Sequence, residues 1–136
     1  SELSVYAKFN NAVFRLIKAH TPGPYTFVLP ATKEVPRRLQ HPKRKTIGLR
    51  IPVNNIALAL LEELNEPLMS STLILPGETM PMTEADEIAD QLSKHVDLII
   101  DGGACGSEPT TVVEFINDLP EVVRVGMGDP EPFEVE

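Results

Sequence analysis

The sequence predicts an α/β fold, a twisted open sheet of mixed parallel and antiparallel strands with flanking helices. Two observations support this prediction. Residues 46–77 read as strand, helix, strand, because apolar residues alternate at both ends and recur at helical spacing in 56–64. Residues 111–125 read as two strands joined by a short turn, which suits a hairpin. A helical crossover joins parallel strands and a hairpin joins antiparallel ones, so the sheet should contain both.

The elements are expected in a mixed order, with about six strands and three or four helices in one domain over residues 1–126. Residues 127–136 are acidic and contain prolines, so we expect a loose tail. The first eight residues carry no strong signal. The expected helices cover 10–19, a short segment 35–39 entered through Pro36, 56–64, and a segment to about 94 that follows a capping-box pattern of Thr83 and Asp86; the expected strands cover 25–29, 46–51, 68–75, 96–100, 111–115 and 121–125.

Composition places the chain among cytoplasmic proteins. No apolar run approaches the length of a membrane span, and no charged and then apolar leader is present. Cys105 is the only cysteine, so neither an intramolecular disulfide nor a cysteine cluster for zinc is expected. The three histidines are scattered, and we expect no resident metal.

Charge is distributed unevenly along the chain. Residues 1–50 hold ten Lys/Arg and two acids, and residues 51–136 hold two Lys/Arg and eighteen acids, so the halves carry about +8 and −16. A basic block of this kind is a candidate surface for phosphates, and a solvated loop is the alternative. Six cations in this block are candidate RNA contacts: Lys33, Arg37, Arg38, Lys43, Arg44 and Lys45.

Motifs for common catalytic devices are absent: no phosphate-binding P-loop, dinucleotide fingerprint, metalloprotease helix or serine elbow occurs. What remains is a set of hydroxyl and guanidinium groups at the ends of expected strands. If the crossover forms, Arg50 and the hydroxyls of residues 70–72 come out near one sheet edge, where open α/β sheets bind ligands. This set suits an acid and a nucleotide, although a surface arginine and serines that satisfy their own backbone would explain it too. The set comprises Thr26, Arg50, Ser70, Ser71, Thr72, Thr110, Thr111 and Arg124.

Several phrases together resemble the YrdC/YciO family, in order, at similar spacing and over nearly the whole chain. They are Pro22-Gly23-Pro24-Tyr25-Thr26-Phe27, Ile47-Gly48-Leu49-Arg50-Ile51-Pro52, Glu66-Pro67-Leu68-Met69-Ser70-Ser71-Thr72, Asp97-Leu98-Ile99-Ile100-Asp101-Gly102-Gly103 and Pro109-Thr110-Thr111-Val112-Val113. Two further phrases, Lys33-Glu34-Val35-Pro36-Arg37-Arg38-Leu39 and Lys43-Arg44-Lys45-Thr46-Ile47-Gly48, are similar to the YciO branch.

The resemblance implies a twisted sheet with a concave, positively lined face that binds double-stranded RNA or tRNA. It also implies an activity. The synthases of the family join threonine, bicarbonate and ATP, with Mg²⁺, into threonylcarbamoyl-AMP and pyrophosphate, for threonylcarbamoyladenosine formation in tRNA. Such a protein positions reactants and neutralises phosphate charge, so no catalytic side chain and no tightly bound cofactor are expected.

The resemblance also assigns roles to individual residues. Arg50 would pair with the threonine carboxylate, and Thr110, where the family usually has serine, would help hold the same substrate. Ser71 and Thr72 would face the nucleotide phosphates, and Arg124 would contact the phosphate end of the nucleotide.

Two departures separate this chain from the synthases. Thr72-Leu73-Ile74 stands where they have Ser-x-Asn, so Ile74 replaces an asparagine. Their Lys-x-Arg motif has no match before Pro22, and we expect the chain to lack roughly the first sixty residues of a longer protein. Three hypotheses therefore stand: a threonylcarbamoyl-AMP synthase, an RNA-binding module without that activity, and a regulatory domain.

Overall fold

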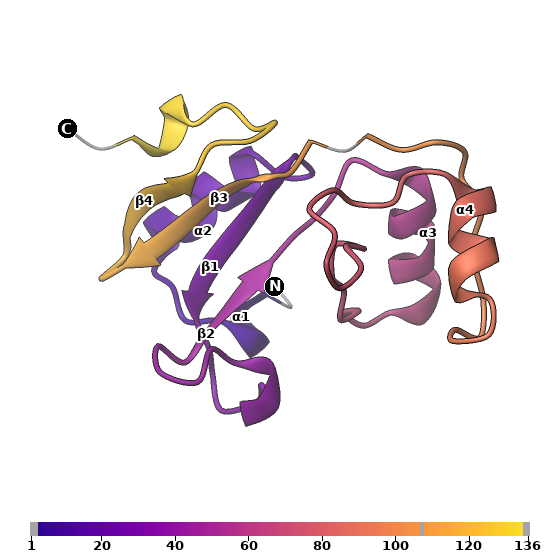
Figure 1. Ribbon diagram of the computed structural model, residues 1–136. Coiled ribbons are helices and arrows are strands. Elements are labelled where there is room, and N and C mark those ends of the chain that lie inside the picture. Colours follow the sequence, from indigo (N-terminus) through magenta and orange to yellow (C-terminus); the bar gives the residue numbers. More distant parts are fainter. Residues whose placement is uncertain (1–2, 107, 135–136) are drawn as a thin grey trace. The chain divides into compact units, whose positions relative to one another are not determined.

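The structure, a computed structural model, describes residues 3–106 and 108–134. Its contacts divide the chain into two compact units, Ser1–Asn54 with Pro109–Glu136, and Asn55–Glu108. The first unit contains the sheet, and the second contains two helices and the irregular segments around them (Figure 1). No helix in the described part of the chain is long and apolar enough to span a membrane.

The first unit is built on a four-stranded open sheet in the order β2-β1-β3-β4 (Figure 1). Its strands are β1 (Tyr25–Pro30), β2 (Thr46–Leu49), β3 (Thr111–Ile116) and β4 (Leu119–Arg124). β1 pairs with β3 in parallel, while β1 with β2 and β3 with β4 are antiparallel. The mixed sheet predicted from the sequence is therefore confirmed.

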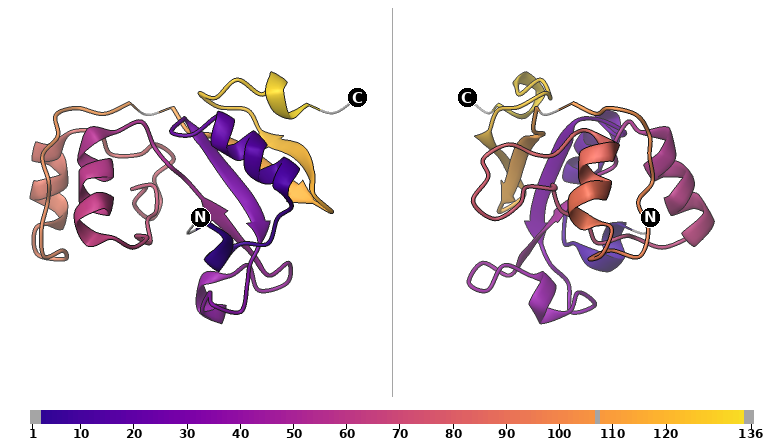
Figure 2. Two further views of the ribbon diagram at one scale, coloured as in Figure 1. Left: turned by 180° about the vertical axis from the view of Figure 1, so that it is seen from behind. Right: turned by 45° about the vertical axis from the view of Figure 1, so that its right-hand side comes forward.

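The core of this unit lies between one face of the sheet and α2 (Asn11–Ala19), which crosses that face in the view from behind (Figure 2). Asn10 caps the helix, because its Oδ1 accepts a hydrogen bond from the N–H of Val13 at 2.9 Å. Alternate strand residues point inward, as period-two apolar patterns require. The buried side chains are Val13 and Ile17 from α2, Tyr25, Phe27 and Leu29 from β1, and Val113 and Phe115 from β3.

The hairpin between β3 and β4 turns at Asn117 and Asp118, whose φ angles are +53° and +62°. Two successive residues with positive φ form a type I′ turn, which matches the right-handed twist of paired strands. Asn and Asp tolerate this conformation better than other side chains. The predicted hairpin is confirmed, and it places the end of β4 beside the start of β3.

The chain termini contribute more to the core than the sequence predicts. A short helix, α1 (Leu3–Tyr6), precedes Ala7, which is buried, where no element is expected. The 3₁₀ helix η2 (Glu131–Phe133) brings Phe133 to 0% exposure, with its ring against those of His20 and Tyr25. Residues 127–134 are thus anchored to the core at Gly128 and Phe133, while Met127, Asp129, Glu131 and Glu134 are exposed.

The second unit keeps the predicted helices and lacks the predicted strands. The helices are α3 (Asn55–Leu64) and α4 (Ala85–Leu92), but residues 68–75 and 96–100 are irregular within the described chain. An apolar pattern shows only that a segment could pack in a sheet. A strand also needs a neighbouring strand to satisfy its backbone hydrogen bonds. In 68–75 the N–H of Ile74 bonds locally to the carbonyl of Thr72. None of the described residues between 55 and 108 is buried.

Two smaller predictions also differ from the structure. The segment expected to be helical over 35–39 is a single 3₁₀ turn, η1 (Arg37–Leu39). The expected capping box is wrong, because α4 starts one residue before Asp86, and Glu84 occupies the cap position without a side-chain hydrogen bond. Thr83 therefore lies outside the helix, where its hydroxyl cannot reach the first-turn N–H groups of α4 as a cap would.

Candidate functional site

Four of the predicted site residues lie at one edge of the sheet in the first unit. β2 runs antiparallel to β1, so Arg50, which follows β2, lies beside the start of β1, where Thr26 is the second residue. β3 runs parallel to β1, so Thr110, which precedes β3, lies at the same edge, and Arg124 ends β4 there. Strand direction alone thus gathers two hydroxyls and two guanidiniums from distant parts of the sequence.

Three of these side chains form a continuous hydrogen-bonded row. The hydroxyls of Thr26 and Thr110 are 2.7 Å apart, and either can donate. Arg124 donates through Nη2 to the Thr110 hydroxyl at 3.1 Å. It also donates from Nε and Nη2 to the Thr110 carbonyl oxygen, at 3.0 and 2.8 Å. The structure therefore brings Thr26, Thr110 and Arg124 together on the sheet face opposite the core.

The free N–H groups of the two arginines differ. A guanidinium carries five N–H donors, and Arg124 directs three of them at Thr110, so only those on Nη1 lack a partner among the described residues. Arg50 is exposed, and none of the described residues forms a hydrogen bond or ion pair with its guanidinium. Arg50 can therefore bind a carboxylate with two parallel hydrogen bonds, whereas Arg124 has only the N–H groups of Nη1 available for a ligand.

A backbone strap fixes the position of Thr110. The N–H of Gly126 donates to the Thr111 hydroxyl at 2.9 Å, and that hydroxyl donates to the Gly128 carbonyl at 2.6 Å. Residues 126–128 thus run close over the start of β3. A Cβ on Gly126 would lie 2.2 Å from the Pro109 carbonyl oxygen, which leaves no room for a side chain. Thr111 is fully buried, so it positions its neighbour and does not face a ligand.

Ser71 and Thr72 belong to the second unit, in the irregular segment after α3. Both are exposed, and the Ser71 hydroxyl donates to the Thr72 carbonyl at 3.2 Å. Ile74, which replaces the asparagine of the synthase motif, is 45% exposed. Within this unit the segment presents these hydroxyls and the apolar side chains of Leu68, Met69 and Ile74 to solvent.

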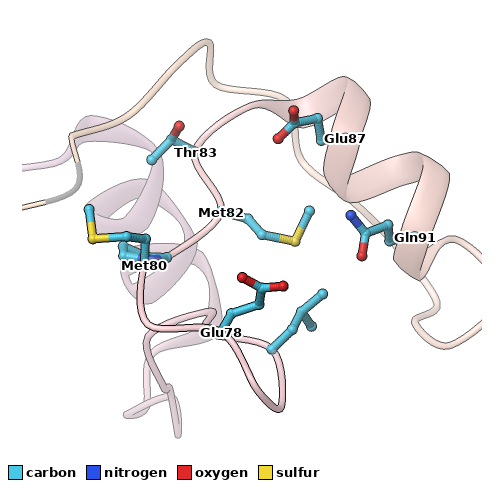
Figure 3. A pocket seen from close by; sticks show the side chains of 8 residues that line it. Glu78, Met80, Met82, Thr83, Glu87 and Gln91 are labelled. Atoms are coloured by element: carbon cyan, nitrogen blue, oxygen red, sulfur yellow. The ribbon is translucent and has the colours of Figure 1, made fainter.

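Sequence reasoning overlooks a pocket of about 260 Å³ in the second unit. Figure 3 shows it between the start of α4 and the preceding loop, with the carboxylates of Glu78 and Glu87 and the amide of Gln91 around Met82. No basic side chain lines it, so it repels phosphates and does not suit a nucleotide. It is lined by Leu75, Glu78, Met80, Pro81, Met82, Thr83, Glu87 and Gln91.

The six candidate RNA contacts all lie in the first unit, between β1 and β2, and all are exposed. Arg44 differs from the others because its Nη1 lies 3.4 Å from a carboxylate oxygen of Glu114 on β3. No group of three or more metal-ligating side chains occurs among the described residues.

The sequence of this chain is similar to a known family profile and to several known proteins. The profile of the Sua5/YciO/YrdC family, described as telomere recombination, matches residues 1–126. The uncharacterized protein YciO of Escherichia coli strain K12 is 56% identical over 133 residues, 98% of this chain and 65% of the relative. The threonylcarbamoyl-AMP synthase of Pyrococcus abyssi is 34% identical over 113 residues, which cover 82% of this chain and 32% of the synthase.

Solved structures agree with the sequence matches. The crystal structure of E. coli YciO superposes with a TM-score of 0.89 over 98% of this chain and 65% of that one. P. abyssi Sua5 complexed with L-threonine superposes with a TM-score of 0.80 at 31% identity, over 92% of this chain and 37% of that one. The chain thus spans just under two thirds of the YciO relatives and about a third of the synthase.

Proposed function

Because the chain belongs to the Sua5/YciO/YrdC family, we propose that the whole protein is a threonylcarbamoyl-AMP synthase. It would use L-threonine, bicarbonate and ATP with its Mg²⁺, and serve the threonylcarbamoyladenosine modification of tRNA. The observation that carries the proposal is the sheet edge where Thr110 and Arg124 are bonded and Arg50 is free. The synthase relatives and the threonine complex of one of them support it.

In this proposal each side chain has one task. The Arg50 guanidinium holds the threonine carboxylate with two N–H groups, and the Thr26–Thr110 pair supplies hydroxyls to the same substrate. The threonine amine and bicarbonate form a carbamate with loss of water, and a carbamate oxygen then attacks the α-phosphate of ATP and displaces pyrophosphate. The Nη1 of Arg124 would bond phosphate oxygens at the sheet edge. The prediction that Ser71 and Thr72, in the second unit, contact the nucleotide is a separate part of the proposal. Catalysis then comes from positioning and charge stabilisation.

The test is release of pyrophosphate by the whole protein incubated with ATP, threonine and bicarbonate. Release should require all three reactants and should fall at least tenfold in Arg50→Ala, because a charge-assisted bidentate contact contributes about 1.5–3 kcal/mol. Arg38→Ala is the matched control, since it removes an exposed arginine from η1 instead. Equal release by the protein and its Arg50→Ala variant would end the proposal.

A second candidate function is RNA binding without synthase activity. The exposed cations between β1 and β2 favour it. Affinity for a double-stranded RNA should then fall steeply with salt, and should weaken when Lys43, Arg44 and Lys45 are changed together to alanine. An affinity for double-stranded RNA that does not change with salt concentration would contradict this candidate.

A regulatory domain that has lost the chemistry, which Ile74 in place of the synthase asparagine favours, is separated from the synthase by thermal shift. Bound threonine or ATP raises the unfolding temperature by mass action. A regulatory domain that binds neither ligand should show no increase in unfolding temperature with threonine or ATP.

A further inference from the structure

The turn that carries Lys43, Arg44 and Lys45 is held by its own hydrogen bonds. The N–H of Lys45 donates to the His41 carbonyl at 2.9 Å, and the N–H groups of Lys43 and Arg44 donate to His41 Nδ1 at 3.2 and 3.0 Å. The N–H of Ala31 donates to the Lys45 carbonyl at 3.0 Å, which ties the turn to the end of β1. This turn, residues 41–45, belongs to the loop drawn beyond the end of the sheet in Figure 1.

Arg44 is the residue of this turn that reaches the sheet. Its Nη1 lies 3.4 and 3.5 Å from the two carboxylate oxygens of Glu114. β1 separates β2 from β3, so the Arg44 side chain must cross β1 to reach β3. Its aliphatic stem can cover that strand while the charged end meets the acid.

Glu114 is an unusual residue for its place in the sheet. By register it lies opposite Val28 on β1 and Glu121 on β4, on the face away from the core, yet its side chain is only 10% exposed. Two carboxylates directly opposite each other in antiparallel strands repel. A buried carboxylate also needs a cation or hydrogen bonds. Among the described residues, Arg44 supplies the cation.

We propose that Glu114 is a positioning residue that clamps the basic turn 41–45 onto the sheet through Arg44. The Arg44 side chain stays 65% exposed, but its charge is paired with that of Glu114, so this arginine adds no net charge to the turn. Lys43 and Lys45 are exposed, and the clamped turn presents them in a fixed arrangement. In this proposal Arg44 has a structural role, whereas Lys43 and Lys45 are the two cations available to bind a partner.

The first test measures opening of the turn by trypsin cleavage after Lys45 under native conditions, since such cleavage reports local opening. Glu114→Gln should raise the cleavage rate roughly fivefold, the factor expected when an ion pair worth about 1 kcal/mol is lost. Glu121→Gln removes an exposed carboxylate that lies opposite Glu114 on the same sheet face, so it relieves repulsion and should leave the cleavage rate unchanged or lower it. Equal rates in these two variants would overturn the proposal.

A second pair of variants avoids disturbing the buried site. Arg44→Gln should accelerate cleavage after Lys45 as Glu114→Gln does, and the conservative Arg44→Lys should restore a rate within twofold of the unchanged protein. A purely steric role for Arg44 predicts equal cleavage rates for the two variants, because glutamine and lysine both retain much of the stem. Equally fast cleavage of the lysine and glutamine variants, or slow cleavage of both, would refute the clamp.

The consequence for RNA rests on the RNA-binding candidate and has its own readout. In a salt titration with double-stranded RNA, Lys43→Gln and Lys45→Gln should each lower the slope of log affinity against log salt by about 0.9, the value of one phosphate contact. Arg44→Gln should leave that slope unchanged. A slope change for Arg44→Gln as large as for the lysines would contradict the clamp, whereas failure of RNA binding itself leaves the trypsin result to decide.

Discussion

The burial of Phe133 gives a sharp prediction about stability. Phe133→Ala deletes a fully buried ring whose centroid lies 4.9 Å from that of His20, 5.1 Å from that of Tyr25 and 5.5 Å from that of Phe27. Removing a buried phenylalanine costs about 3–5 kcal/mol through lost burial and the cavity left behind. That is a large share of the roughly 5–15 kcal/mol that holds a domain folded.

Urea denaturation measures the effect. With a denaturant slope near 2 kcal/mol/M, the midpoint should fall by roughly 2 M. Met127→Ala is the matched control, because it shortens a 58% exposed side chain of the same segment and should change the free energy of unfolding by under about 0.5 kcal/mol. A loss below about 1 kcal/mol in Phe133→Ala would show that residues 127–134 do not belong to the core.

Three further changes test the packing, the capping and the ionisation of the first unit. Gly126→Ala should lower the free energy of unfolding by about 1–3 kcal/mol, since its Cβ would meet backbone oxygens, while Gly106→Ala, with nothing within 4 Å, should be neutral in the same urea assay. Asn10→Ala should cost about 1 kcal/mol through the lost cap and Asn11→Ala nothing, measured by thermal unfolding. Burial, and secondarily a nearby carboxylate, raise the pKa of Tyr25 above its usual 10.0, so the folded state holds this proton more tightly than the unfolded one. Its contribution to stability should be complete below pH 10 and decline above it, and Tyr25→Phe should flatten that decline in denaturation at successive pH values; an identical decline would contradict the assignment.

Sequence patterns predict the first unit well because its strands pair with neighbours inside the unit. Alternation in β1, β2 and the β3–β4 hairpin coincides with available partners, so apolar pattern and hydrogen bonding agree. Residues 68–75 show the same alternation, and residues 96–100 are nearly all apolar, but neither segment has a partner strand in the described chain, so both predictions fail. Leu98, at 77% exposure, shows how far pattern and burial diverge there.

The candidate site, like the fold, can be predicted from the sequence only in part. The hairpin predicts that Arg124 lies near Thr110, but not that three N–H groups bond to Thr110, since this depends on the register shift between Val112 and Val113. Glu114 reads as an outward strand residue, and its burial depends on Arg44, seventy positions away. Phe133 lies among acidic residues and prolines, and no extended apolar pattern of helical or strand spacing includes it, so no sequence pattern predicts its burial.

The central claim is that Arg50 and Thr110 form one site for the carboxylate-bearing substrate L-threonine at the sheet edge. A calorimetric titration of the whole protein with L-threonine tests it most directly, comparing Arg50→Gln, Thr110→Val and the control Arg38→Gln. Affinity should fall at least tenfold in Arg50→Gln, fall by a smaller factor in Thr110→Val, and stay within twofold in the control. Threonine binding that is equally strong in all four proteins would contradict the account.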